Sequence, residues 1–226
     1  MIVMKYYENG NLYQCLDHHK GILPWRDIVD ILWGIAGGLE EIHAEGKVHR
    51  NLHGGNLFII LIENKKDARI GDMGLHGPCY NKSSNQIYGV LPYITPEVLC
   101  GENHSTISDF YSFGIIMNVL ATGKKSWYDR AHDISLAKDI CDGKRLKIPE
   151  DTPKFYAVLM RQCWNNEPEK CPTASHLYKK FNCTNINLFD NEFSVSEDKR
   201  RITISQLPKT YMVYSSGNTS QNVLYK

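Results

Sequence analysis

A polar stretch of eight residues, from His49 to Asn56, contains side chains that could take part in catalysis. It reads His-Arg-Asn-Leu-His-Gly-Gly-Asn, and a second polar loop around Asp72 reads Ile-Gly-Asp-Met-Gly. Asn51 in the first loop can hydrogen-bond a hydroxyl group, but it has no carboxylate that would accept a proton. Whether the chain is an enzyme therefore depends on what these two loops can do with an amide at position 51.

Apolar periodicity predicts the elements that position these loops. A helix is expected from Ile28 to His43, because its apolar residues recur at helical spacing: Ile28, Ile31, Leu32, Ile35, Leu39 and Ile42. Pro24 lies at the start of this helix, where proline is tolerated. Three glycines inside the helix (Gly34, Gly37 and Gly38) lower its propensity but allow close packing. The apolar run from Leu57 to Ile62 predicts a strand that leads through a hairpin to the Asp72 loop.

The order helix, polar loop, hairpin and Asp-containing loop resembles the catalytic and metal-binding loops of a protein kinase. The family pattern is His-Arg-Asp-Leu with a following Asn, and then Asp-Phe-Gly. By this resemblance Asn56 and Asp72 hold the Mg²⁺ ions that bridge the phosphates of ATP. Met73 replaces the Phe of Asp-Phe-Gly, where it fills an apolar gap.

The same resemblance places Asn51 at the position of the catalytic Asp. Loss of a general base is worth about 10²–10⁴-fold in rate, so catalysis is expected to be impaired. His49 and Arg50 match the family pattern, and the family Arg reads a phosphate on the activation loop. His53 is the one side chain of the loop that we consider as a replacement base, and an ordinary loop histidine is the more frequent case.

Further motifs follow in the order and spacing of the family. Residues 1–16 resemble the last strand of the N-lobe, the interlobe hinge and a helix that begins at Leu12. In that reading Met4 is the gatekeeper, and Met4, Lys5 and Tyr7 line the adenine site, with Tyr6 also in the hinge. Ser108-Asp109-Phe110-Tyr111-Ser112-Phe113-Gly114-Ile115 resembles the start of a buried helix, whose Asp109 is expected to brace the catalytic loop.

The activation segment is expected to run from Asp72 to Thr95-Pro96-Glu97, which is close to the family's Ala-Pro-Glu. Its candidate phosphorylation sites are Ser83, Ser84 and Tyr88. In the family the Glu of Ala-Pro-Glu pairs with a buried Arg, and Cys171 replaces that Arg here. A buried carboxylate without its partner costs on the order of 3–5 kcal/mol. Glu97 is therefore expected to be protonated, hydrated or paired again, with Lys170 as the candidate cation.

The resemblance implies a mainly α (α+β) fold, that of a kinase C-terminal lobe with small β-hairpins, over residues 1–181. From residue 182 to 226 Asn, Ser, Asp, Glu and Lys dominate, which predicts a disordered tail. Short strands are considered at Ile202–Ile204 and Met212–Tyr214 in that tail. The charge run Asp198–Arg201 is interpreted as a solvated patch that is too short to bind nucleic acid.

Composition excludes several other classes. The formal net charge of +1 gives no attraction to nucleic acid or membrane, and no window approaches 18 uninterrupted apolar residues. The seven cysteines form no Cys-x-x-Cys pair, so reduced thiols in a cytoplasmic (intracellular) protein are expected rather than a disulfide framework or a zinc site. The first residues lack the apolar length of a signal peptide.

The chain shows no Gly-x-Gly-x-x-Gly, no strand Lys and no partner Glu of a kinase N-lobe. A C-lobe alone gives adenine one wall and the phosphates two metal ligands, so tight ATP binding is not expected. We therefore favour a pseudokinase that acts as an interaction module in intracellular signalling, with other signalling proteins or kinases as partners. The alternatives are an active ATP- and Mg²⁺-dependent protein kinase completed by an N-lobe, and a non-functional fragment of a partial gene.

Overall fold

Two helices, α2 (Trp25–Ala44) and α4 (Thr106–Thr122), form the centre of the computed structural model. The structure describes residues 5–73, 77–78, 88–165, 167, 170–182 and 190–206. α2 has the apolar spacing predicted from the sequence, and its residues Ile28, Ile31 and Ile35 are fully buried. α4 is buried around almost its whole circumference and begins with a capping box between Ser105 and Ser108.

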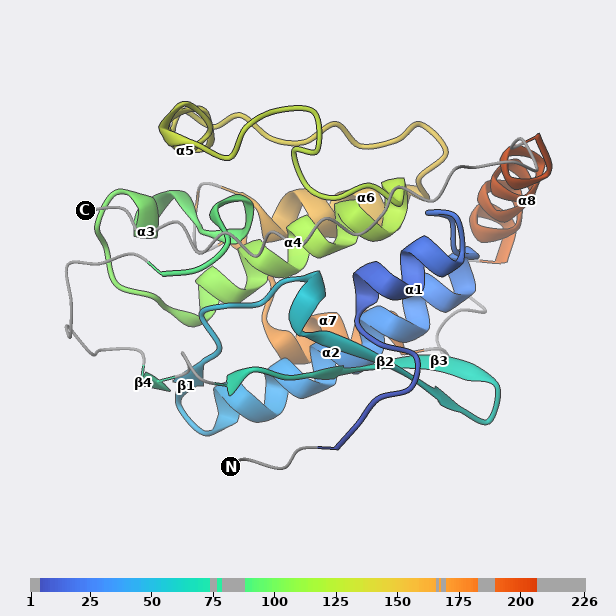
Figure 1. Cartoon of the computed structure of the whole chain (residues 1–226), viewed down its shortest axis with the longest axis horizontal. Coiled ribbons are helices and arrows are strands. Elements are labelled where there is room, and N and C mark those ends of the chain that lie inside the picture. The colour runs from blue at the N-terminus through green and yellow to red at the C-terminus, as the bar shows by residue number, and fades with distance from the viewer. Residues whose placement is uncertain are drawn as a thin grey trace.

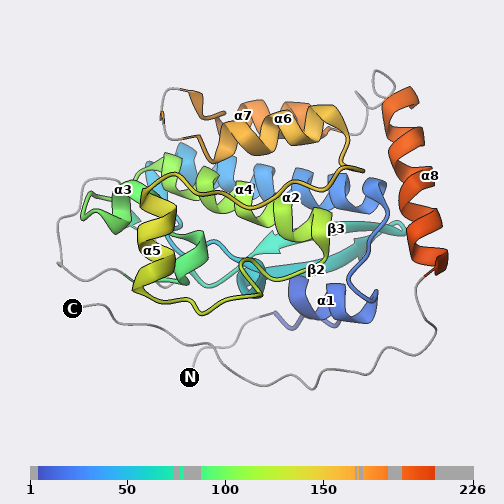
Figure 2. The same cartoon turned by 90° about the horizontal axis from the view of Figure 1, so that it is seen from above.

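The other elements cover these two helices on opposite sides (Figure 2). One side carries α6 (Lys154–Cys163) on α4 and α7 (Ala174–Phe181) on α2. The other side carries the antiparallel hairpin β2 (Leu57–Ile62) and β3 (Lys65–Ile70), together with α1 (Leu12–His18). A second two-stranded sheet pairs β1 (Lys47–Val48) with β4 (Gly77–Pro78). The remaining short elements are η1 (Gly54–Asn56), η3 (Leu91–Tyr93), α3 (Pro96–Leu99) and α5 (Ile134–Cys141).

The predicted role of the α2 glycines in close packing is confirmed. A Cβ atom at Gly34 would lie 1.9 Å from the Asp67 carboxylate and 2.9 Å from the Ala68 carbonyl of β3. Gly38 faces Ile70 in the same way, at 3.0 Å. The hairpin therefore lies directly on the backbone of α2, and this fixes where the two polar loops at its ends are placed.

Residues 190–206 differ from the sequence expectation. They form helix α8 (Asp190–Gln206), so the strand considered at Ile202–Ile204 is wrong and the expected disorder does not hold for this segment. α8 lies at one end of the molecule (Figures 1 and 2). Met212–Tyr214 lie outside the described residues.

Two charged side chains attach α8 to the core, which is the physical reason for the difference. Glu197 accepts a hydrogen bond of 2.8 Å from the backbone N–H of Trp25 at the start of α2. Arg200 is buried and donates to the carbonyls of Leu23, Ala121 and Leu120 at 2.7, 2.9 and 3.1 Å. An acid at a helix N-terminus and a base at a C-terminus both complement the helix dipole. Arg200 is thus a buried anchor and not part of a solvated patch.

Candidate functional site

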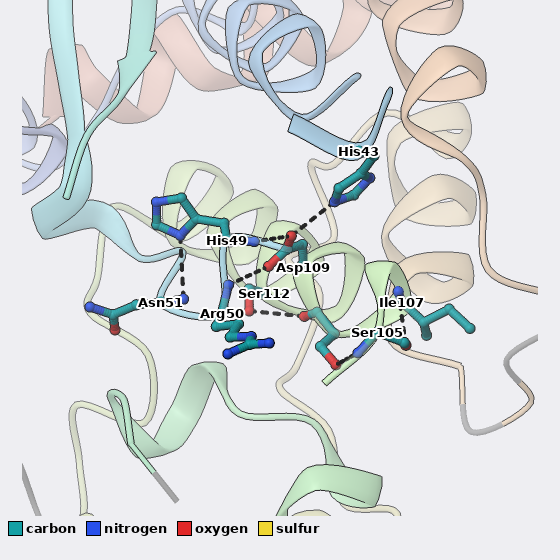
Figure 3. A network of polar contacts seen from close by, with 9 residues as sticks. His43, His49, Arg50, Asn51, Ser105, Ile107, Asp109 and Ser112 are labelled. Atoms are coloured by element: carbon teal, nitrogen blue, oxygen red, sulfur yellow. Dashed lines mark hydrogen bonds and ion pairs between the residues drawn. The ribbon is translucent and has the colours of Figure 1, made fainter. Parts of the chain in front are cut away.

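The carboxylate of Asp109 organises the polar loop from His49 to Asn56 (Figure 3). It lies in the first turn of α4 and is 1% exposed. Its Oδ2 accepts hydrogen bonds from the backbone N–H of His49 at 2.8 Å and from His43 Nε2 at 2.9 Å. Its Oδ1 accepts a bond of 3.0 Å from the backbone N–H of Arg50. The predicted bracing of the loop by Asp109 is confirmed.

His49 joins the polar loop to the Asp72 loop. Its fully buried imidazole donates from Nε2 to the carbonyl oxygen of Gly71 at 3.0 Å. Its Nδ1 accepts a bond of 3.3 Å from the backbone N–H of Asn51. These two partners fix the neutral tautomer that carries its proton on Nε2. His49 therefore holds the two loops in register and is too enclosed to meet a substrate.

Asn51, Asn56 and Asp72 converge on one point. Asn56 Nδ2 donates to Asp72 Oδ2 at 3.3 Å and to the Asn51 carbonyl oxygen at 2.9 Å. Asn51 Nδ2 donates to the same Asp72 oxygen at 3.3 Å. The exposed carboxylate of Asp72 is thus held by two amide groups. A carboxylate at position 51 would repel Asp72 at this distance, whereas the amide attracts it.

Arg50 and Asp72 have strained backbones. Their φ angles are 70° and 56°, in the left-handed region that non-glycine residues seldom adopt. Such strain costs on the order of 1–3 kcal/mol per residue and occurs where the surrounding structure holds functional groups in place. Asp109 supplies that constraint at Arg50. The sequence carries no signal for it, because neither position is a glycine.

His53 lies at the edge of the same loop. Its Nδ1 accepts a hydrogen bond of 3.1 Å from the backbone N–H of Gly55, so this nitrogen carries no proton. Burial, and then the nearby His49, lower the pKa of His53 to about 4, against a smaller opposing effect of Asp72. An imidazole with this pKa is a weak proton acceptor at neutral pH. His53 is therefore a poor candidate for a replacement base.

The pKa of His53 makes the stability of the fold dependent on pH. Between pH 6.5 and 4 the unfolded chain binds a proton at His53 and the folded chain does not, so the free energy of unfolding falls as the pH falls through this window. We expect a loss on the order of 2 kcal/mol between pH 7.5 and 5 from this group. Urea unfolding at both pH values would measure it. The His53→Gln variant should lose less over the same interval, and parallel pH dependences of the two proteins would contradict the assignment.

The hinge residues lie beside the hairpin. The ring of Tyr7 stacks on Phe58 of β2 at 5.0 Å, and Lys5 Nζ lies 5.7 Å from the centre of the Tyr7 ring. Tyr6 is 84% exposed. Met4 lies outside the described residues. The Phe58 ring also lies beside Gly71, where a Cβ atom would be 2.5 Å from it, so Phe58 contacts both Tyr7 and the Asp72 loop. No hydrogen bond joins Lys5 or Tyr7 to that loop within the described residues.

The end of the activation segment packs into the lobe. The Tyr93 hydroxyl shares a hydrogen bond of 2.7 Å with the Tyr13 hydroxyl of α1, and Ser112 Oγ donates to the Tyr93 carbonyl at 2.7 Å. No local pattern indicates the Tyr13–Tyr93 pair, because the two residues are 80 positions apart. Of the three candidate phosphorylation sites, Tyr88 is exposed, and Ser83 and Ser84 lie outside the described residues.

The expected pairing of Glu97 with Lys170 is wrong. Lys170 Nζ instead lies 2.6 Å from the carboxylate of Glu167, three residues earlier in the chain. That pair is local and exposed, so it forms without any contribution from α3. Within the described part of the chain no ion pair joins Glu97 to a cation. Among the residues that the structure describes, Glu97 therefore supplies no ion pair between α3 and the helical core.

Comparison with known proteins identifies this arrangement. The family model described as protein tyrosine and serine/threonine kinase matches residues 1–181. The chain belongs to the protein kinase family. The kinase domain thus accounts for every element from α1 to α7, and α8 lies beyond the matched region.

Similar proteins include a serine/threonine-protein kinase, a mitogen-activated protein kinase kinase kinase and an ephrin receptor. A probable serine/threonine-protein kinase of Dictyostelium discoideum is 31% identical over 80% of this chain, which covers 11% of that protein. Mitogen-activated protein kinase kinase kinase 12 of Rattus norvegicus is 30% identical over 76% of this chain and 19% of its own length. Ephrin type-A receptor 8 of the same species is 28% identical over 78% of this chain and 48% of its own length. The chain thus spans about a tenth to a half of these relatives.

The kinase family uses ATP and Mg²⁺, and the residues at this site fit the metal by donor type. Mg²⁺ prefers oxygen ligands, and Asp72 and Asn56 offer a carboxylate and an amide oxygen. When bound, the ion neutralises phosphate charge. In the structure both asparagine amides direct N–H groups to Asp72, so Asn56 would have to turn its oxygen toward the metal and Asn51 would have to release the carboxylate.

No described helix is long and apolar enough to cross a membrane.

Proposed function

We propose that this kinase domain is a pseudokinase, which serves as an interaction module in intracellular signalling and does not transfer phosphate. Asn51 carries this proposal, since it stands where the family places the catalytic Asp. An amide can orient a hydroxyl group but cannot take its proton, which is worth about 10²–10⁴-fold in rate. His53 does not compensate, because its pKa of about 4 and its bond to Gly55 leave it a poor base.

The hydrogen bonds of Asn51 support the proposal further. With the family's Asp at this position, two neighbouring carboxylates would repel each other in the absence of a cation. Here the Asn51 amide donates to Asp72 at 3.3 Å. This bond stabilises the loop in the absence of metal and competes with a cation for Asp72. The loop is thus held in its kinase-like arrangement by contacts that do not serve catalysis.

Partners of this module would be other signalling proteins or kinases that bind the folded lobe. We assign to them the surface around the start of α5. It carries two exposed side chains, Tyr128, which precedes the helix, and Ile134, its first residue, at 62% and 73% exposure. Tyrosine is enriched at protein interfaces.

The test is a comparison of the wild-type protein, at its native length, with Asp72→Ala. Both are incubated with radiolabelled ATP, Mg²⁺ and a mixture of serine-, threonine- and tyrosine-containing peptides. We expect equal, background incorporation of phosphate, because the wild type already lacks the catalytic carboxylate. Incorporation by the wild type that Asp72→Ala removes would overturn the proposal.

An active kinase is the second candidate, and the convergence of Asn56 and Asp72 favours it. Both potential metal ligands are present and adjacent, and Arg50 is held by Asp109. In this reading the native protein supplies an N-lobe and Asn51 only orients the acceptor hydroxyl. The same assay separates the candidates, since an active kinase requires wild-type incorporation above that of Asp72→Ala.

A further inference from the structure

Two cysteines lie side by side at the contact between α3 and α5. Cys100 directly follows α3, and Cys141 is the last residue of α5. Their sulfur atoms are 3.7 Å apart, with the Cys100 thiol donating to the sulfur of Cys141. The Cys141 thiol in turn donates to the carbonyl of Pro96 in the first turn of α3, at 3.9 Å. Both side chains are exposed, so solvent and small oxidants reach them.

We propose that Cys100 and Cys141 form a reversible disulfide that locks α3 to α5. A disulfide requires the sulfur atoms to approach to about 2.05 Å. Starting from 3.7 Å, this is a movement of less than 2 Å, and exposed side chains can make it by rotating about their χ1 bonds. The two helices already pack against each other, so the backbone is in place.

The contacts of α3 suggest what the Cys100–Cys141 disulfide would do for the protein. Glu97 in α3 has no ion pair within the described part of the chain, because Cys171 replaces the arginine of the family and Lys170 pairs with Glu167. Among the described residues, no ion pair of the reduced protein thus replaces the one that holds the end of the activation segment in other kinases. A bond from Cys100 to Cys141 replaces that ion pair with a covalent tie, only under oxidising conditions.

The oxidant we assign is hydrogen peroxide. The Cys100 thiolate attacks one peroxide oxygen, the O–O bond breaks, and water leaves after protonation, which yields a sulfenic acid. The Cys141 sulfur then attacks the Cys100 sulfur, the S–S bond forms and the S–O bond breaks with loss of a second water. Two thiols lose two electrons and two protons in total, and the peroxide accepts them.

The electrostatics of Cys141 agree with this order of steps. Partial desolvation raises the pKa of Cys141 to about 11, and the neighbouring Cys100 thiol acts in the same direction. Cys141 is therefore a neutral thiol at neutral pH and poorly suited to attack peroxide first. To resolve a sulfenic acid on Cys100, Cys141 must also lose its proton. Oxidation of Cys100 favours this step, because it removes the Cys100 thiol that contributes to the raised pKa of Cys141.

The test uses the full chain. Reduced protein is treated with hydrogen peroxide, alkylated, purified as the monomer and digested with trypsin without reduction. Lys124 and Arg130 lie between the two cysteines, so the disulfide joins two separate tryptic peptides. We expect the linked peptide in wild type and in the control variant Cys171→Ser, and its loss in Cys100→Ser and Cys141→Ser. We also expect the oxidised protein to melt about 5 °C or more above the reduced protein, because the bond closes a loop of about 40 residues.

Two outcomes would overturn the proposal. One is a folded wild-type monomer in which peroxide converts Cys100 to sulfinic acid without any linked peptide. The other is a linked peptide whose formation leaves the melting temperature unchanged, since α3 and α5 would then not be locked by the bond. Circular dichroism of the two serine variants verifies that they are folded, so that a missing link reports on the missing thiol.

Discussion

Replacing Asp109 with alanine is expected to lower the free energy of unfolding by about 3–5 kcal/mol, because three enclosed donors lose their acceptor together. The Asp109 carboxylate accepts bonds from the buried N–H groups of His49 and Arg50 and from the imidazole of His43. Each donor left without an acceptor costs about 1–3 kcal/mol. The left-handed backbone of Arg50 also loses its restraint. For a domain of this size we expect the melting temperature to fall by roughly 10 °C.

Urea unfolding followed by tryptophan fluorescence would measure this loss. The matched control is Asp133→Ala, because Asp133 also accepts a backbone N–H bond, at the exposed start of α5. Loss of such a cap costs about 1 kcal/mol. Equal losses in the two variants would contradict the special position of Asp109, since burial and the number of accepted bonds are what distinguish them.

The polar loop from His49 to Asn56, the Asp72 loop and the bracing Asp109 could be predicted from sequence motifs. These features depend on short spacings, and α2 is predictable because its apolar residues repeat at helical intervals. The fold of residues 1–181 follows from five such motifs in their family order. The family match over the same residues agrees with it.

Contacts between distant residues were not predictable. The segment of α8 was expected to be disordered because Asn, Ser, Asp, Glu and Lys dominate its sequence. The structure shows that its buried residues include Phe193, Ser196 and Arg200, which form no apolar stripe. Arg200 is stabilised by three carbonyl oxygens from other parts of the chain, which no local pattern reveals. The wrong pairing of Glu97 with Lys170 has the opposite cause. The motif suggested a distant partner, whereas Lys170 pairs locally with Glu167, three residues earlier in the chain.

The second large effect concerns position 51. Asn51→Asp restores a carboxylate at the place where the family keeps its catalytic Asp. We expect phosphoryl transfer by the protein at its native length to rise about 10²–10⁴-fold, the usual worth of a positioned general base. The new carboxylate also loses the amide bond to Asp72 and repels it, so the variant should be less stable than wild type without Mg²⁺ and should regain stability with Mg²⁺ and ATP.

Asn51→Ala is the matched control for this variant. Alanine also frees Asp72 from the amide, but it brings no carboxylate. If release of Asp72 for Mg²⁺ were the limiting effect, both variants would gain activity. We expect a gain in Asn51→Asp only, because the proton acceptor is the missing component.

The central claim is that an amide at position 51 is what separates this kinase fold from catalysis. The most direct test of this claim is a ratio of two rates. The rates are those of phosphate transfer from ATP and Mg²⁺ to a peptide acceptor by Asn51→Asp and by wild type, each corrected with Asp72→Ala. The predicted ratio is about 100 or more, with the wild type at background. A ratio near one would contradict the claim.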